Sequence, residues 1–118
     1  MIPLTSSATA RHWIRQLEAL PGQVALVSVL PGLIGIAVVT WLRPPFKADG
    51  SALPLGDVIN YTVRRYNTAG DLLATNNAGG ALTLELTGLA SGLWDFTVAA
   101  VSLVGEGAES AKGRVMVL

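Results

Sequence analysis

The spacing of apolar residues changes near residue 20, from the 3.6-residue period of a helix to the two-residue period of a strand. This change limits the folds that the chain can adopt more than any other feature does. Beyond that point apolar and polar side chains alternate in several segments, as they do in strands that bury one face. Clusters of glycine, asparagine and aspartate between these segments are typical of turns. The pattern predicts an all-β fold, a two-sheet antiparallel sandwich of about seven strands. The alternating segments are residues 39–42, 59–64, 82–87 and 94–101, and a last strand is expected over about 113–118.

Residues 24–42 contain no charged side chain and are numerous enough to cross a bilayer as a helix. Trp41 lies near one end, as an interfacial anchor would, so a membrane span is one interpretation. Against it, Pro31 and Gly32 fall in the middle, where proline costs a helix roughly 3 kcal/mol. The many valines and isoleucines also favour strands. We therefore predict two strands, 24–30 and 33–41, joined by a turn at Pro31 and Gly32, and no membrane span.

Residues 1–20 are predicted to be an N-terminal extension, and residues 21–118 to be the sandwich. Ser6 or Ser7 can cap a helix that runs from about residue 8 to 20, where the following proline and glycine would end it. A helix this short is marginal alone in water, so its apolar face must dock on the sandwich or on a neighbour. We expect the extension to be an interface anchor. One face of the predicted helix carries Ala10, Trp13, Ile14 and Leu17.

Charge is scarce throughout the chain. Of the 118 residues 51% are hydrophobic and 14% charged, and eight basic residues balance eight acidic ones. This composition excludes a disordered chain and, because phosphate neutralisation needs clustered cations, a nucleic-acid-binding one. A charge-poor surface without net charge favours association, so we expect other protein subunits as partners and a homo-oligomer. A soluble monomer is the alternative. The lack of cysteine excludes disulfides, thiolate metal sites and thiol nucleophiles.

No combination of residues in the sequence supports catalysis. His12 is the only histidine, and the nearest carboxylate along the chain, Glu18, is six residues away and on another face of the predicted helix. Asp49 and Asp57 could share a Ca²⁺ ion, but the chain lacks the alternating acidic loop of such sites, and aspartates are common in turns. We therefore expect a non-enzymatic protein with no catalytic residue, no cofactor and no metal site.

Several fragments occur in the order and at the spacing of a known family. They are Trp41 with Pro44-Pro45, Tyr61-Thr62-Val63, Leu86-Thr87-Gly88-Leu89 with Ser91-Gly92, Trp94-x-Phe96-x-Val98-x-Ala100, and Gly105-x-Gly107 through Ser110. With them, residues 21–118 resemble a fibronectin type III domain, an immunoglobulin-like sandwich. Two positions depart from the family. Trp94 stands where the family usually has a tyrosine whose hydroxyl caps a corner of the backbone, so that hydrogen bond is replaced or absent. Ser91 stands where the family usually has proline.

Trp41 is the expected centre of the core on physical grounds alone, because period-two burial places it between the two sheets. Its neighbours there are expected to be Tyr61, Val63, Phe96 and Val98.

Two surfaces are candidates for contact with a partner. The resemblance implies that the loops after the second and sixth strands emerge at one end of the sandwich, and apolar loop tips are typical of contact patches. The alternative is that Leu53 and Leu55 fold back to cap the core. The other surface is the apolar face of the predicted helix, since aromatic side chains anchor interfaces. The candidate interface residues are Phe46, Leu53, Leu55, Leu103 and Val104 in the loops, and Trp13, Ile14 and Leu17 in the extension.

The resemblance also suggests a biological role. A charge-poor, cysteine-free single module resembles the accessory domains of tailed-phage virions, so we expect a structural or binding module on the exterior of a virion, in capsid decoration or in the tail. Attachment to a host-surface glycan is part of this expectation. The alternative is a secreted or cell-surface adhesion or carbohydrate-binding accessory domain. Because fold does not dictate function, these remain predictions.

Overall fold

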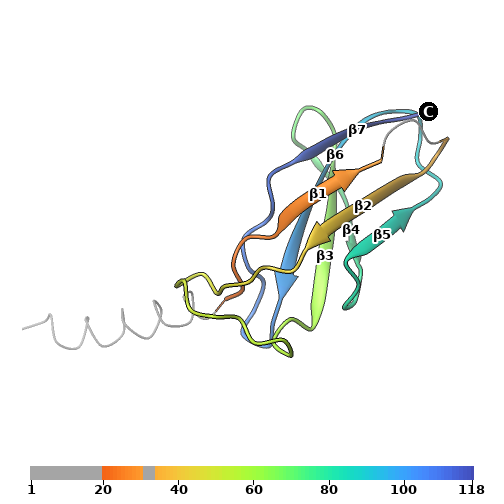
Figure 1. The fold of residues 1–118 in the computed structure, drawn as a ribbon. Helices are drawn as coiled ribbons and strands as arrows, with labels where there is room; N and C mark the ends of the chain where they lie inside the picture. The colour runs from red at the N-terminus through yellow and green to blue at the C-terminus, as the bar shows by residue number, and fades with distance from the viewer. Residues whose placement is uncertain (1–19, 31–33) are drawn as a thin grey trace, which may run out of the picture.

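The computed structural model describes residues 20–30 and 34–118, which form two packed antiparallel sheets (Figure 1). One sheet has the strand order β1-β2-β5 and the other β4-β3-β6-β7. The predicted seven-stranded sandwich is thus confirmed. The strands are β1 (Ala25–Val29), β2 (Ala37–Leu42), β3 (Asn60–Tyr66), β4 (Leu72–Asn77), β5 (Thr83–Leu86), β6 (Gly92–Val101) and β7 (Gly113–Val117).

The uncharged segment forms two strands of one sheet. β1 and β2 pair antiparallel, with Leu26 opposite Trp41 and Val29 opposite Val39. The two predicted strands are present, although the second begins at Ala37 rather than at residue 33. The turn predicted at Pro31 and Gly32 falls outside the described residues. Within residues 20–30 and 34–118, no helix has the length and apolarity to span a membrane.

The core lies between the inner faces of the two sheets, as the alternation predicts. Trp41 is 1% exposed and its ring centroid is 5.5 Å from that of Tyr61, which belongs to the opposite sheet. The expected neighbours are part of the same cluster, so the predicted role of Trp41 is confirmed. The other buried members are Val24, Ala37, Val39, Val63, Phe96, Val98, Ala100, Val115 and Val117.

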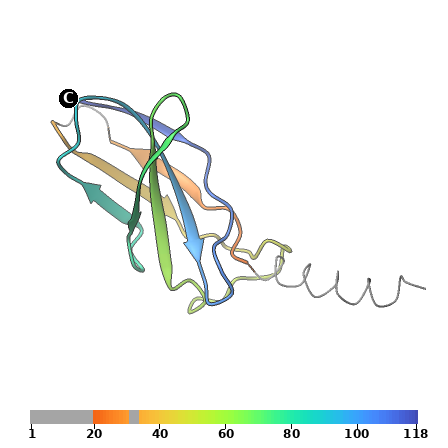
Figure 2. The same ribbon diagram turned by 180° about the vertical axis from the view of Figure 1, so that it is seen from behind.

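β6 differs from the prediction, because its residues 95–100 are buried on both faces rather than one. Asp95, Thr97 and Ala99 were expected to be exposed, yet each is at most 4% exposed. β6 lies between β3 and β7 in the four-stranded sheet, and Arg114 of β7 and Glu109 of the following loop cover its outer face. Figure 2 shows this sheet from behind the view of Figure 1.

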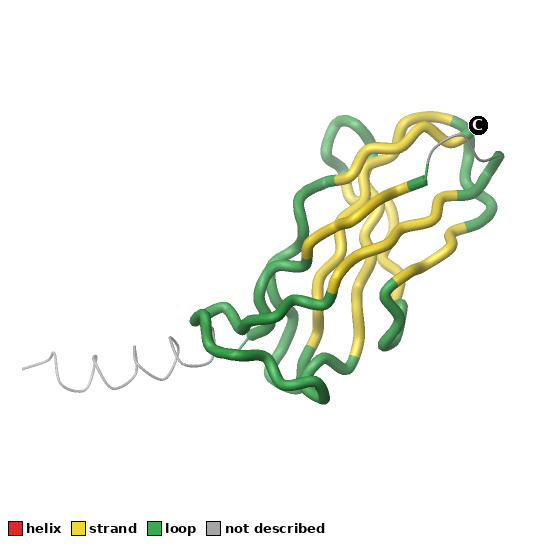
Figure 3. The backbone as a smooth tube through the Cα atoms, in the orientation of Figure 1, coloured by secondary structure: helices red, strands yellow, loops and turns green. Residues whose placement is uncertain are grey.

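The predicted helix over residues 8–20, with Trp13, Ile14, Leu17 and His12, lies outside the described residues except for Leu20. The carbonyl of Leu20 accepts a hydrogen bond from the amide of Ala48 at 2.8 Å. The chain therefore enters the sandwich beside the connection between β2 and β3, at the end where long loops gather (Figure 3).

Candidate functional site

The two long connections of the sandwich meet at one end, as predicted. They are residues 43–59 between β2 and β3, and residues 102–112 between β6 and β7. Both carry large apolar side chains in water: Leu55 is 88% exposed and Leu103 is 91% exposed. We call four of the predicted interface residues, all of them exposed, the loop-end patch: Phe46, Leu55, Leu103 and Val104.

Leu53 is not part of this patch, which corrects one of the predicted interface residues. It is only 5% exposed, whereas Leu55 two residues later is 88% exposed. The amide of Leu53 donates to the carbonyl of Pro45 at 3.1 Å, and Arg43 Nη2 donates to the carbonyl of Leu53 at 3.0 Å. The capping alternative therefore holds for Leu53 and not for Leu55.

A groove of about 250 Å³ runs between the two loops. An ion pair in the wall of this groove lies near Leu103 and Val104: Lys47 Nζ is 3.9 Å from Asp57 Oδ2. Partner side chains could thus find both apolar surface and charge here. The groove is lined by Lys47, Gly56, Asp57, Ser102, Leu103 and Val104.

The two aspartates considered above as Ca²⁺ ligands have separate protein partners. Asp49 Oδ1 accepts hydrogen bonds from the amide of Ser51 at 2.8 Å and from its hydroxyl at 2.5 Å. These bonds lower the pKa of Asp49, while Asp57 faces Lys47. In the described part of the chain no three histidine, cysteine or acidic side chains gather as metal ligands.

The tip of the loop between β6 and β7 is held by short-range hydrogen bonds. The amide of Ser102 donates to the carbonyl of Gly105 at 2.9 Å, and Gly105 returns a bond to Ser102 at 3.2 Å. Ser102 Oγ also accepts from the amide of Val104 at 3.1 Å. Leu103 and Val104 therefore project from a closed turn, which lowers the entropy that binding would cost.

A polar network on the outer face of the four-stranded sheet holds the base of the same loop. We call it the Arg64 cluster; it consists of Arg64, Tyr66, Thr97, Glu106 and Glu109. Arg64 Nη2 donates to both carboxylate oxygens of Glu106, at 2.9 and 2.8 Å. Glu109 Oε1 accepts from Tyr66 at 2.6 Å, Thr97 at 3.1 Å and Arg64 at 3.2 Å.

The sequence analysis did not identify this cluster. Arg64 lies more than 40 residues from both glutamates along the chain, so no local spacing reveals the contact. The only available signal was the placement of Arg64 on an outward position of a predicted strand.

Removing Arg64 should loosen the loop. We expect Arg64→Met to accelerate amide hydrogen exchange in residues 102–107 about tenfold. A tenfold change corresponds to about 1.4 kcal/mol, which is the order of free energy that partly exposed charged hydrogen bonds contribute. The measurement is hydrogen exchange by mass spectrometry. Arg114→Met is the matched control: it breaks the pair with Asp95, at 2.9 Å, between β6 and β7. Equal acceleration of residues 102–107 in both variants would contradict the assignment.

Acid should weaken the sandwich through its paired carboxylates. Hydrogen bonds from Arg114 lower the pKa of Asp95. Those from Tyr66, Thr97 and Arg64 lower the pKa of Glu109 against the opposing effect of its burial. Since both pKa values are lower in the folded state, their contribution is present at neutral pH and is lost as pH falls below about 4. Urea unfolding from pH 7 to 3 should show this loss, and Glu109→Gln should flatten it.

Neither a protein-family model nor a curated protein sequence matches the chain. Solved structures do. The sixth fibronectin type III domain of human fibronectin type III domain containing protein 3 is 26% identical, with a TM-score of 0.63 over 82% of this chain and 86% of that one. The FN5 domain of Drosophila Lar is 22% identical, with a TM-score of 0.60 over 83% and 97%. A fibronectin type III domain derived from the human KIAA0970 protein is 17% identical, with a TM-score of 0.67 over 90% of this chain and 82% of that one.

The fold is that of a fibronectin type III domain. Fibronectin type III domains are generally binding or structural modules and are typically non-catalytic.

The corner where the fibronectin type III family usually has a tyrosine is closed by tryptophan in this domain. Trp94 Nε1 donates to the carbonyl of Ala90 at 2.9 Å, four residues upstream. The hydrogen bond that the tyrosine hydroxyl usually makes is thus replaced rather than absent. The guanidinium of Arg65 also lies 4.8 Å from the centroid of the Trp94 ring.

Loss of this corner bond should be measurable. We expect Trp94→Phe to lower the free energy of unfolding by about 1 kcal/mol beyond the change in burial, because the Ala90 carbonyl loses its donor. Trp94→Tyr, which supplies a hydroxyl, should recover part of the loss. Urea unfolding followed by far-ultraviolet circular dichroism measures both, and identical values for the two variants would contradict the assignment.

Proposed function

We propose that this protein is a non-enzymatic assembly module that binds another protein subunit through the loop-end patch. The observation that carries the proposal is the exposure of Leu55 and Leu103, 88% and 91%, at the same end of the sandwich. Apolar side chains gathered at loop tips are typical of interaction sites, and function in this fold resides in loops on a scaffold. The hydrogen bonds behind Leu103 support the same use, because a pre-ordered loop binds at lower entropic cost.

The proposal includes the N-terminal extension as a second anchor. Leu20 joins the sandwich beside the loop-end patch, through its bond to Ala48. In this proposal the predicted apolar face of Trp13, Ile14 and Leu17 contributes to the same interface. Aromatic and aliphatic side chains together suit contact with a protein partner.

The assembly that we propose is a virion, with the module on its exterior as a capsid decoration or tail component. The support comes from the composition: 14% charged residues and no net charge suit a protein that functions while bound to other subunits. Host attachment through a surface glycan is a further role of the same loop end, where Phe46 is 55% exposed and available for stacking. The alternative remains an adhesion or carbohydrate-binding domain at a cell surface.

The test is incorporation into particles. Quantitative mass spectrometry of density-purified virus particles should find the chain at a fixed copy number, and its absence from them would overturn the virion role. The double variant Leu55→Asp with Leu103→Asp should lower incorporation at least about tenfold, since it charges the centre of the patch.

The matched control is Leu73→Asp, which charges a 44% exposed leucine on β4, outside the loop-end patch. It should leave incorporation unchanged. Equal incorporation of all variants would show that the loop-end patch is not the contact.

A further inference from the structure

The edges of the two sheets are protected unequally. The edge strands among the described residues are β1 and β5 in one sheet and β4 and β7 in the other. β5 contains Glu85, β7 contains Arg114, and Asp71 directly precedes β4. β1 has no charged residue in it or adjacent to it along the chain, because residues 23–42 contain none. Charge on an edge strand blocks pairing with another chain, and β1 lacks this protection.

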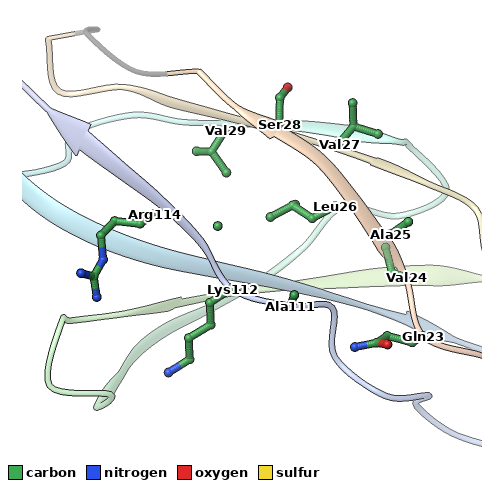
Figure 4. A pocket seen from close by; sticks show the side chains of 11 residues that line it. Gln23, Val24, Ala25, Leu26, Val27, Ser28, Val29, Ala111, Lys112 and Arg114 are labelled. Carbon is green, nitrogen blue, oxygen red and sulfur yellow. The ribbon is translucent and has the colours of Figure 1, made fainter.

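A groove runs along β1. A cavity of about 540 Å³ lies between β1 and the segment that leads into β7, and Leu26 and Val29 point into it (Figure 4). Gly113 forms part of the opposite wall, and a side chain there would collide with Leu26. The side chains of Lys112 and Arg114 extend away from β1 in this view. They are engaged elsewhere, with the ring of Tyr66 at 4.8 Å and with Asp95 at 2.9 Å.

We propose that β1 pairs antiparallel with β1 of a second copy of this chain, about a two-fold axis near Val27. This inference rests on the proposed assembly role and names one of its contacts. Pairing would join two three-stranded sheets into one of six strands, and it would satisfy the backbone groups of both free edges. Such an interface is self-complementary, as a two-fold contact must be.

The residues of β1 favour a second copy over a charged partner. Two uncharged strands bring no like charges together, and the chain has no net charge to oppose the encounter. β1 has one feature that blunts an edge, a bulge between Leu26 and Ser28. A two-fold axis near Val27 places the bulges of the two β1 strands opposite each other, so that both strands bend in the same way. Val27 itself is 55% exposed and free to meet its counterpart.

The oligomeric state tests this directly. Size-exclusion chromatography with light scattering should show the full chain as a dimer at micromolar concentration. Val27→Lys should raise the dimer dissociation constant at least about tenfold, because it sets two cations face to face at the axis. Thr83→Lys is the matched control: it adds the same charge to an exposed residue of β5, the other edge of the sheet, and should leave the dimer intact. A monomer at all concentrations, or a dimer that Val27→Lys does not weaken, would overturn the proposal.

A cross-link tests the register. The chain has no cysteine, so Val27→Cys introduces a single thiol. Residues opposite each other in an antiparallel pair have Cα atoms roughly 4.5–5.5 Å apart, within the range of a disulfide. Mild oxidation should link most of Val27→Cys into dimers and little of Thr83→Cys. Equal linking would overturn the β1 interface. A chain that enters particles through the loop-end patch yet is monomeric alone would refute this dimer and leave the proposed function standing.

Discussion

Trp41→Ala should remove a large share of the free energy of unfolding of the sandwich. Removal of a fully buried indole typically costs about 3–5 kcal/mol, from lost burial and from the cavity that remains. Domains of this size have roughly 5–15 kcal/mol of stability in total. The effect should be at the upper end, because the ring lies between the two sheets and contacts Tyr61 of the opposite sheet. Urea unfolding followed by circular dichroism measures the loss.

The control for Trp41 separates its ring from its polar group. Trp41 Nε1 is the one buried side-chain nitrogen or oxygen in residues 20–30 and 34–118 without a hydrogen-bond partner. Trp41→Phe removes that unsatisfied donor while it keeps an aromatic ring, so its cost should be well below that of alanine. If Trp41→Ala cost less than about 1 kcal/mol, the central place of the indole in the core would be wrong.

The alternation of side chains predicted the core because burial in a strand is a local property. Val39 and Trp41 face inward on β2, while Leu42 is exposed, as a period of two requires. The same reasoning distinguished two strands from a membrane helix in residues 24–42. The family resemblance, and not the alternation, predicted that the loops after β2 and β6 share one end.

The features that the sequence did not predict depend on contacts between distant segments. Alternation along β6 says nothing about Arg114, which covers Asp95 from the next strand. It says nothing of Glu109, which reaches Thr97 from the following loop. Leu53 and Leu55 are both apolar and two residues apart, and only the path of the loop decides that one is buried and the other exposed.

The loop between β6 and β7 is held from two sides, which explains how it presents its tip. The Arg64 cluster holds its base over the outer face of the four-stranded sheet. On its other side, Gly107 packs directly on the backbone of Pro21 and donates to the carbonyl of Ala100 at 2.8 Å. Pro21 precedes β1, so this glycine ties the loop to the segment by which the chain enters the sandwich.

Among the glycines of residues 20–30 and 34–118, Gly107 should therefore be the one whose replacement by alanine is most damaging. An added Cβ would collide with the carbonyl oxygen of Pro21 and come within 2.9 Å of its carbonyl carbon. Backbone on both sides cannot yield as the end of a flexible side chain can. We expect a loss of about 3 kcal/mol or more, at the upper end of the cost of overpacking. Residues 102–107 should also lose protection from hydrogen exchange.

Gly80→Ala is the matched control, since nothing lies within 4 Å of an added Cβ there and Gly80 does not have a positive φ. It should stabilise the protein by roughly 0.4–1 kcal/mol, because alanine restricts the unfolded chain more than glycine does. If the same substitution destabilises the protein at Gly107 and stabilises it at Gly80, contact with Pro21 explains the loss at Gly107. The intrinsic conformational preference of glycine would act alike at both positions. If both variants proved equally stable, the loop would not pack on Pro21, and the leucine tip would not be held in place from that side.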